Sequence, residues 1–526
     1  MPFLLRNLEL NPGEGEERLA DLVMARFSLS PDELVSFRVV RKAVDARKKS
    51  HIRFIFAVEF TLADEQPFWE RHRNDRDMEL VPARSRPTYP RLAGRGRIII
   101  AGMGPAGIFA GLRLLEYGLA PIILERGRPV QERIRDIASF WKDGVLNPES
   151  NVQFGEGGAG TFSDGKLTTR IRDANSSYVM EMLVRFGAPR DILYLAKPHI
   201  GTDRLRRVIV NIRRHLEDHD LAIRFREKVT DIISGSGRLQ GVIINDALEE
   251  PCDILLLASG NSARDTFAML GERGIRLEAK PFAVGVRVEH PQELIDRIQY
   301  GVAGHPLLPP AEYALTWNDR LDGRSAYSFC MCPGGVVVAA ASEQGGVVTN
   351  GMSNYRRDAA YANSALVVGV GREDFPDDSP LAGVAFQRAL ERRAFMAGGG
   401  DYRAPAQNLM AFLGDKGSFR IASSYRPGVR ETDLCDILPG FVTDTLREGI
   451  RSFGRKMRGF ITCEATLTGV ETRTSSPLRI VRGEDFQSVS LAGLYPVGEG
   501  AGYAGGIMSS ALDGIRVADA IAHALM

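Results

Sequence analysis

The first 63 residues alternate between strand-like and helix-like hydrophobic patterns. Apolar and polar positions alternate in residues 3–10 and 51–62, and between them Leu19, Val23 and Phe27 recur at helical spacing. We therefore expect a small N-terminal α+β module over residues 1–63. The next segment is polar, rich in arginine and interrupted by proline, so we expect a linker over residues 64–94.

A different pattern begins after the linker. Residues 97–101 form an apolar run, a glycine-rich turn follows, and an amphipathic stretch leads to a second apolar run that ends in Glu125. The turn Gly102-Met-Gly104-Pro-Ala-Gly107 fits the G-x-G-x-x-G spacing of dinucleotide-binding βαβ units, in which glycine lets the backbone approach a pyrophosphate. An acid at position 125 suits a ribose hydroxyl and argues against the 2′-phosphate of NADP.

A second glycine cluster lies some 400 residues later, at "GLYPVGEGAGYAGGI" (493–507), before an apolar helical run. A strand-like run also ends at Ala258-Ser259-Gly260, directly after a hairpin signal. Flavoproteins have an Ala-Thr-Gly strand end and a closing glycine motif of this kind, in which an acid, here Glu499, holds the ribitol or pyrophosphate. We expect the two clusters to meet around one FAD, with the last helix directing its N-terminus at the flavin ring.

Longer motifs strengthen this interpretation. They are "VQFGEGGAGTFSDGKL" (152–167), "KPHIGTD" (197–203), "PFAVGVRVEHPQELID" (281–296), "YSFCMCPGG" (327–335), "TNGMSNYRRD" (349–358) and "GVETRTSSPLRI" (469–480). With them the chain resembles, over nearly its whole length, the bacterial NAD(FAD)-utilising dehydrogenases, also called uncharacterised FAD-dependent proteins, of the glutathione-reductase-like FAD superfamily. The resemblance implies bound FAD and a redox role, and it supplies no substrate.

The expected fold is α/β, with a Rossmann-type FAD-binding domain, an inserted α+β substrate cap and a ferredoxin-like N-terminal module. We place the FAD-binding domain at residues 95–262 and 461–526, and the cap at 263–460. The expected FAD contacts all lie in the motifs above. They are Gly102, Gly104, Pro105, Ala106, Gly107, Glu125, Arg126, Gly158, Thr161, Ser163, Asp164, Lys166, Val229, Ala258, Ser259, Gly260, Gly498, Glu499, Gly505, Gly506 and Ile507.

The candidates for reactive groups are Cys330, Cys332 and His199. The two cysteines are two apart on an expected strand, so both thiols would share one face and could exchange electrons with flavin. Free cysteines are commonly buried, so two small buried apolar residues is the favoured explanation, and a Cys-x-Cys pair alone lacks the ligands for zinc. A single histidine is more often structural than catalytic. We expect no metal site.

Two nucleotide motifs fail on inspection. The segment from Gly160 to Leu167 nearly fits a P-loop, but Leu167 stands where a magnesium-binding Ser or Thr is needed. Gly369-Val-Gly371 lacks the third glycine of a second dinucleotide site. A nicotinamide donor, NADH or NADPH, would therefore have to bind without a domain of its own.

Composition limits the remaining choices. With 67 basic and 66 acidic residues, the balance gives no argument for nucleic acid or for a membrane surface. Five irregularly spaced cysteines and the absence of a signal-peptide pattern favour the cytoplasm. We expect an FAD-dependent oxidoreductase acting on a small molecule. The alternatives are a flavoprotein that acts on RNA or another macromolecule through the N-terminal module, and a flavin sensor without turnover. The basic run 38–49 could be an RNA footprint, but without interleaved aromatic residues we expect a solvated face or an interdomain contact. The sequence leaves the oligomeric state open.

Overall fold

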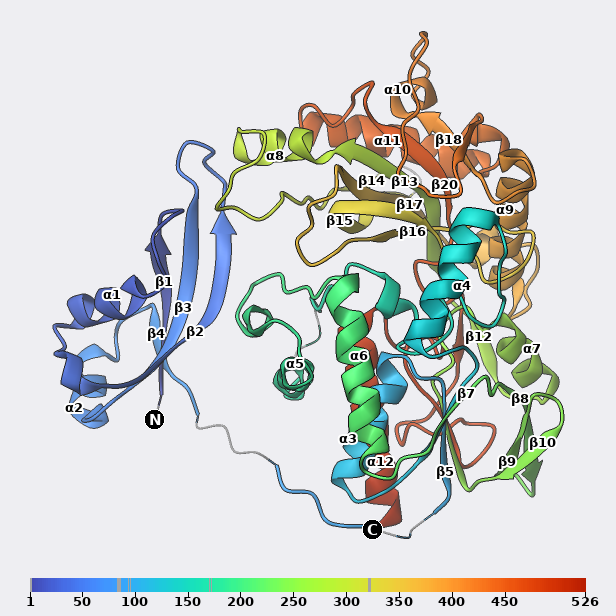
Figure 1. Cartoon of the computed structure of the whole chain (residues 1–526), viewed down its shortest axis with the longest axis horizontal. Helices are drawn as coiled ribbons and strands as arrows, with labels where there is room; N and C mark the ends of the chain where they lie inside the picture. Colours follow the sequence, from blue (N-terminus) through green and yellow to red (C-terminus); the bar gives the residue numbers. More distant parts are fainter. Residues whose placement is uncertain are drawn as a thin grey trace.

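The N-terminal module is a four-stranded antiparallel sheet with two helices on one side (Figure 1). Its elements follow the order β-α-β-β-α-β, and the sheet order β2-β3-β1-β4 is that of a ferredoxin-like unit. The helix predicted around Leu19, Val23 and Phe27 is present, and these three side chains are buried in the module. The elements are β1 (Phe3–Leu10), α1 (Arg18–Phe27), β2 (Leu34–Asp45), β3 (Arg53–Leu62), α2 (Glu65–His72) and β4 (Met78–Leu80).

The module is therefore longer than expected. Helix α2 and strand β4 lie inside the segment assigned to the linker, because Phe68 and Met78 complete the apolar core under the sheet. The remainder of the expected linker falls partly outside the described residues. The computed structural model describes residues 2–82, 87–92, 94, 96–169, 171, 173–319 and 323–526.

A five-stranded parallel sheet forms the centre of the larger part of the molecule. Its order is β22-β11-β5-β6-β7, so strands from both ends of the chain are neighbours. The predicted strand, glycine turn, helix and second strand are confirmed as β5, α3 and β6. Helices α3, α6 and α12 run alongside one another below the antiparallel sheet (Figure 1). The bounds are β5 (Ile98–Ala101), α3 (Pro105–Glu116), β6 (Ile122–Glu125), α6 (Thr202–Glu217), β7 (Ile223–Phe225), β11 (Ile254–Leu257), β22 (Leu494–Pro496) and α12 (Ile507–Leu525).

An eight-stranded sheet covers one end of the parallel sheet. Its neighbouring strands are antiparallel except for β18 and β19. The last of its strands along the chain is β20, which lies beyond the expected cap boundary at residue 460. The strands are β13 (Phe282–Pro291), β14 (Thr316–Asn318), β15 (Ser325–Ala339), β16 (Thr349–Met352), β17 (Tyr361–Val370), β18 (Ala404–Asn408), β19 (Val429–Glu431) and β20 (Thr466–Glu471).

Shorter elements connect these sheets. The predicted hairpin near "SGSG" is confirmed as β8 and β9, which β10 extends. The connecting elements are α4 (Val130–Asp143), α5 (Ser176–Arg185), β8 (Val229–Gly235), β9 (Arg238–Ile244), β10 (Leu248–Pro251), α7 (Arg264–Glu272), β12 (Leu277–Ala279), α8 (Gln292–Tyr300), α9 (Ala382–Gly398), α10 (Leu409–Phe412), α11 (Gly440–Lys456) and β21 (Leu478–Ile480).

A buried charge cluster joins the two large sheets. The Glu391 carboxylate on α9 accepts hydrogen bonds from Arg264 on α7 and from Arg473 just after β20. All three residues are almost fully buried. Although burial opposes ionisation, the charges of Arg264 and Arg473 lower the pKa of Glu391. Removing one member would leave an uncompensated charge in the interior.

None of the helices in the described part of the chain is long and apolar enough to cross a membrane.

Candidate functional site

A cavity of about 450 Å³ lies where the parallel sheet meets the antiparallel sheet. The carboxyl ends of β5, β6 and β11 open into it through Ala101, Glu125 and Leu257, and Val497 follows directly after β22. On the other side the wall comes from β15, β16 and the end of β20. Ligands of open parallel sheets bind at the carboxyl ends of the strands, so the position is typical of a cofactor site.

The Glu125 carboxylate organises the glycine turn at one end of the cavity. It accepts backbone N–H bonds from Met103 at 2.8 Å, from Gly127 at 2.8 Å and from Gly155 at 3.0 Å. The side chain is 4% exposed. Glu125 was expected to bind ribose. In the structure its two oxygens instead link the turn between β5 and α3, the segment after β6 and the loop that contains Gly155.

Two glycines of this turn differ in whether their position would accept a side chain. Gly102 has a φ of +108°, and a Cβ there would lie 2.4 Å from the Ala258 carbonyl oxygen, so only glycine fits. Gly104 is extended, and its Cβ would meet nothing closer than Gly158 Cα at 3.9 Å. Gly104 therefore leaves open space at the N-terminus of α3, where unpaired backbone N–H groups favour an anion.

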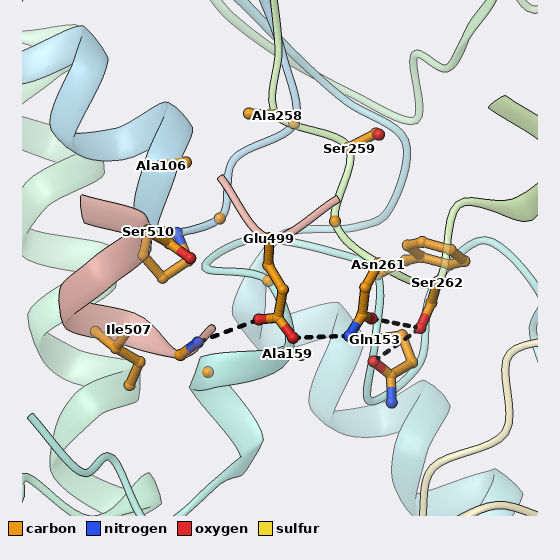
Figure 2. Close-up of a pocket in the computed structure, with 18 of the residues that line it drawn as sticks. Ala106, Gln153, Ala159, Ala258, Ser259, Asn261, Ser262, Glu499, Ile507 and Ser510 are labelled. Carbon is orange, nitrogen blue, oxygen red and sulfur yellow. Dashed lines mark hydrogen bonds between the residues drawn. The ribbon is translucent and has the colours of Figure 1, made fainter. Parts of the chain in front are cut away.

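The N-terminus of α12 lies on the same cavity, together with Glu499 (Figure 2). One Glu499 oxygen accepts a bond from the Asn261 amide at 2.8 Å and the other from the Gly506 N–H at 3.3 Å. Burial raises the pKa of Glu499, although these bonds and the charge of Lys280 oppose that change. A Cβ at Gly505 or Gly506 would meet no atom within 4 Å, so the wall is open backbone here.

Most of the expected cofactor residues line this one cavity. The exceptions are Gly107, Thr161 and Gly498. A Cβ at Gly107 would lie 2.0 Å from the Gly102 carbonyl oxygen, and one at Gly498 2.8 Å from Ala106 Cβ, so both permit close packing beneath the cavity. The residues that line it as expected are Gly102, Gly104, Pro105, Ala106, Glu125, Arg126, Gly158, Ser163, Asp164, Lys166, Val229, Ala258, Ser259, Gly260, Glu499, Gly505, Gly506 and Ile507.

Thr161 and Arg126 are engaged with the protein itself. The buried Thr161 hydroxyl donates to the Glu156 carbonyl. The Arg126 guanidinium pairs with Glu149 and Asp265 and lies 4.0 Å from the centre of the Phe154 ring, so its charge is already balanced. Ser259, by contrast, lines the cavity, and its hydroxyl oxygen is buried and finds no partner among the described residues.

Several lining residues were missed by the sequence interpretation. Asn261 follows the Ala-Ser-Gly strand end directly, so its place next to the motif was the available signal. Asn350 and Glu471 lie within quoted motifs, but only the folded antiparallel sheet brings them to the cavity. Phe329, 38% exposed, also lies within a quoted motif, directly before Cys330.

A buried ionic cluster lies at the cavity wall beside the cysteines. The Asp164 carboxylate, 1% exposed, contacts Lys166 Nζ at 2.9 Å, Arg357 Nε at 3.0 Å and the Ser353 hydroxyl. Burial opposes ionisation, but the charges of Lys166 and Arg357 lower the pKa of Asp164. The nearby thiols and Asp164 in turn raise the pKa of Lys166 against its own burial. Asp164 and Lys166 are thus held as charged groups.

The two cysteines come together through a break in β15 rather than through regular strand alternation. Pairing with β17 shifts register between Phe329 and Cys332, and Cys330 adopts a φ of +46°. Cys330 lines the cavity, whereas Cys332 is fully buried. Lys166 Nζ lies 3.8 Å from the Cys332 sulfur and also donates to the Met331 carbonyl. The neighbours of both cysteines are polar and charged, so the view of Cys330 and Cys332 as simple apolar filler does not describe them.

His199 lies outside the cavity. Its ring is stacked on Tyr355, with 5.4 Å between centroids, and its Nε2 hydrogen-bonds the Tyr355 carbonyl oxygen at 2.9 Å. Burial and the charge of Arg357 lower the pKa of His199. Its backbone pairs with that of Lys166. These contacts make His199 a support for the Lys166 segment, and its expected catalytic role has no geometric basis.

The basic run 38–49 is largely engaged within the protein. Arg38 pairs with Glu59, and Lys42 pairs with Glu16. The Lys42 backbone also bonds to the Tyr194 carbonyl and the Ala196 N–H, which attaches the N-terminal sheet to the main body. The backbone pairing agrees with the expected interdomain contact, and the RNA alternative stays a prediction.

The segment Gly369-Val-Gly371, which the sequence excluded as a second dinucleotide motif, does not lie in a parallel βαβ unit. Gly369 lies on β17 of the antiparallel sheet, and Gly371 follows that strand. No helix follows them in the arrangement that a dinucleotide turn requires.

Comparison with known proteins identifies two matched regions and one full-length relative. Residues 281–474 match a model described as FAD-dependent protein, C-terminal domain-like, and residues 4–61 match a domain of unknown function, DUF8436. An uncharacterized protein of Clostridium beijerinckii (strain ATCC 51743 / NCIMB 8052) is 44% identical over 526 residues, covering 99% of this chain and 98% of the relative. The first match begins and ends at the antiparallel sheet, whose strands run from Phe282 to Glu471.

Similarity to solved structures is weaker. The flavin-dependent brominase Bmp2 is 12% identical, covering 82% of this chain and 79% of that chain, with a TM-score of 0.37. The tetracycline destructase Tet(51) is 12% identical, covering 82% of each chain, with a TM-score of 0.33. TM-scores this low carry no functional weight.

FAD is the cofactor that both the family match and the cavity support, which confirms the sequence-based expectation. The cavity fits an extended dinucleotide because open glycine backbone stands at two helix N-termini that line it. The narrower assignment to NAD(FAD)-utilising dehydrogenases stays a prediction.

Proposed function

Since this chain belongs to the same family as the Clostridium beijerinckii protein, and its cavity is built for FAD, we propose that it is an FAD-dependent oxidoreductase acting on a small organic substrate. The parallel sheet with α3 and α12 would be its Rossmann-type FAD-binding domain. The antiparallel sheet would be the substrate cap. The five free cysteines suit a reducing, cytoplasmic environment.

One observation carries this proposal: two helix N-termini some 400 residues apart in the chain open onto one cavity. The turn at Gly104 and the α3 N-terminus would hold the pyrophosphate, with Glu125 fixing the turn. Glu499 and Asn261 would hold hydroxyls between the two helices. The α12 N-terminus would favour negative charge on the ring system. When bound, FAD supplies hydride or single-electron transfer at its isoalloxazine ring.

The protein side of the site separates two environments. The turn around Gly104 is neutral backbone, whereas another part of the wall holds Asp164 and Lys166 from the loop after residue 162 and Cys330 from the cap. A substrate that enters between the sheets would therefore meet a charged wall next to a thiol. NADH or NADPH would have to dock at this same interface to act as electron donor.

Anaerobic reduction of the purified protein tests the proposal. We expect a yellow protein that releases FAD on denaturation, and whose flavin absorbance is lost on reduction by dithionite and by at least one of NADH, NADPH or a small thiol. A protein that neither contains FAD nor binds it when supplied would contradict the proposal. Flavin that only dithionite reduces would instead favour a sensor without turnover.

A further inference from the structure

We propose that Cys330 and Cys332 form a redox-active dithiol that exchanges two electrons with the flavin and reacts with small thiol or disulfide substrates. The inference rests on the proposed function, because it needs a flavin in the cavity. It names the class of substrate that the oxidoreductase would serve.

The position of the pair is the first support. Cys330 lines the same cavity as Gly505, Gly506 and Ile507, and Cys332 lies behind it in the protein interior. One sulfur is thus open to the cofactor space and the other is shielded from solvent. Cys252, Cys435 and Cys463 do not line the cavity, so they serve as internal controls.

The backbone allows the two sulfurs to approach. In a regular strand, residues two apart have Cα atoms about 6.6 Å apart, near the upper limit for a disulfide. Here the strand is interrupted at Cys330, where φ is +46°. The Cys332 thiol donates to the Cys330 carbonyl oxygen at 3.4 Å. This contact brings the Cys332 side chain against Cys330 before any sulfur–sulfur bond forms.

The charges around the pair favour one thiolate. The interaction with Cys332 lowers the pKa of Cys330. Burial of Cys330 raises this pKa, whereas the charges of Lys166 and Arg287 lower it further. Glu471, which pairs with Arg287, acts in the opposite direction. The same interaction and burial raise the pKa of Cys332. These influences favour ionisation of Cys330 and protonation of Cys332, the combination that exchanges with disulfides.

Electrons and protons balance in the exchange between the dithiol and the flavin. The Cys330 thiolate and the Cys332 thiol together lose two electrons and one proton as the sulfur–sulfur bond forms. Oxidised flavin takes up two electrons and one proton. In the reverse direction reduced flavin returns them and the dithiol is restored. A small disulfide substrate is then reduced by thiol–disulfide exchange, in which Cys330 attacks and Cys332 displaces the product thiol.

A redox titration followed by mass spectrometry tests the pair directly. The background is the holoenzyme with Cys435→Ser and Cys463→Ser, which removes two distant thiols. After equilibration in glutathione buffers, we expect a Cys330–Cys332 disulfide, detected as a linked peptide that is lighter by two hydrogens. With Cys332→Ser added, we expect Cys330 to be trapped as a mixed disulfide by 5,5′-dithiobis(2-nitrobenzoic acid).

The pH profile of Cys330 alkylation by iodoacetamide supplies a second readout. We expect a midpoint below that of an ordinary thiol, and in Lys166→Met a midpoint about one pH unit or more higher, because the nearby positive charge is lost. Lys166→Arg should restore most of the change. Each of these results would support the dithiol.

Two results would overturn it: no Cys330–Cys332 bond at any buffer composition, or a Cys330 midpoint that is ordinary and insensitive to Lys166→Met. If the same preparation holds FAD that NADH or NADPH reduces, the proposed oxidoreductase stands and only the dithiol fails. If no FAD binds while the disulfide still forms, the proposed function fails and the flavin relay fails with it.

Discussion

Gly104→Val gives the sharpest test of the cofactor site, because the protein itself has room for the new side chain. Gly104 is the N-cap of α3 with φ −82° and ψ −175°, an extended conformation that valine adopts readily. The nearest atom to an added Cβ is Gly158 Cα at 3.9 Å, an ordinary contact. The branched side chain would therefore project into the cavity that Gly104 lines.

The two expected effects differ in size. Replacing an N-cap glycine by a β-branched residue costs about 1 kcal/mol of folding stability. Keeping a pyrophosphate from the helix N-terminus would remove at least two hydrogen bonds to a charged group, each worth about 1.5 kcal/mol or more. A loss of about 3 kcal/mol raises the Kd for FAD about 150-fold. Binding should thus be lost while the fold is retained.

The assay measures FAD binding to the apoprotein by fluorescence quenching and the urea midpoint of the same sample. Gly104→Ala should show an intermediate Kd. Gly369→Val is the matched control, because Gly369 lies on β17 away from the cavity and its added Cβ would meet no atom within 4 Å. Wild-type FAD affinity in Gly104→Val, with a normal urea midpoint, would refute the assignment of this turn to the cofactor.

Three further predictions follow from the buried groups. Glu125→Leu should cost about 3 kcal/mol or more in urea unfolding, because three backbone N–H groups lose their acceptor; equal stability would contradict that role. Glu391→Gln should cost about 3 kcal/mol or more, because buried Arg473 loses its ion-pair partner and buried Arg264 keeps only Glu343, whereas the exposed Glu484→Gln should change the urea midpoint little. The pKa values of Asp164 and Glu391 are lowered in the folded state. The stability that these two carboxylates contribute is therefore present above pH 5 and is lost progressively as the pH falls below about 4. A urea midpoint that is flat between pH 6 and pH 3 would contradict this.

The sequence predicted the cofactor end of the site well for a physical reason. Backbone close to a dinucleotide needs glycine at fixed spacing, and a parallel strand must precede it. Both requirements are local, so Gly102, Gly104 and the β5–α3–β6 unit could be found without the fold. The closing cluster at Gly505 and Gly506 was also recognisable, because its glycines precede an apolar helix.

The cap side could not be predicted in the same way. Asn350 and Glu471 reach the cavity only because β16 and β20 belong to one antiparallel sheet, and nothing local in the sequence specifies that pairing. The boundary at residue 460 failed for the same reason, since β20 pairs with β13 across about 180 intervening residues. The N-terminal module was cut too short at residue 63 because β4 has only three residues.

At the cysteine pair the observed geometry differs from the regular strand that the sequence predicts. Regular alternation would place Cys330 and Cys332 on one face of a flat strand, equally exposed or equally buried. The break at Cys330 instead turns one sulfur to the cavity and leaves the other inside, beside Lys166. That asymmetry is what a dithiol relay requires, because an accessible sulfur must meet the substrate while a shielded one completes the exchange. A backbone irregularity, invisible in the residue pattern, therefore creates the functional difference between two identical side chains.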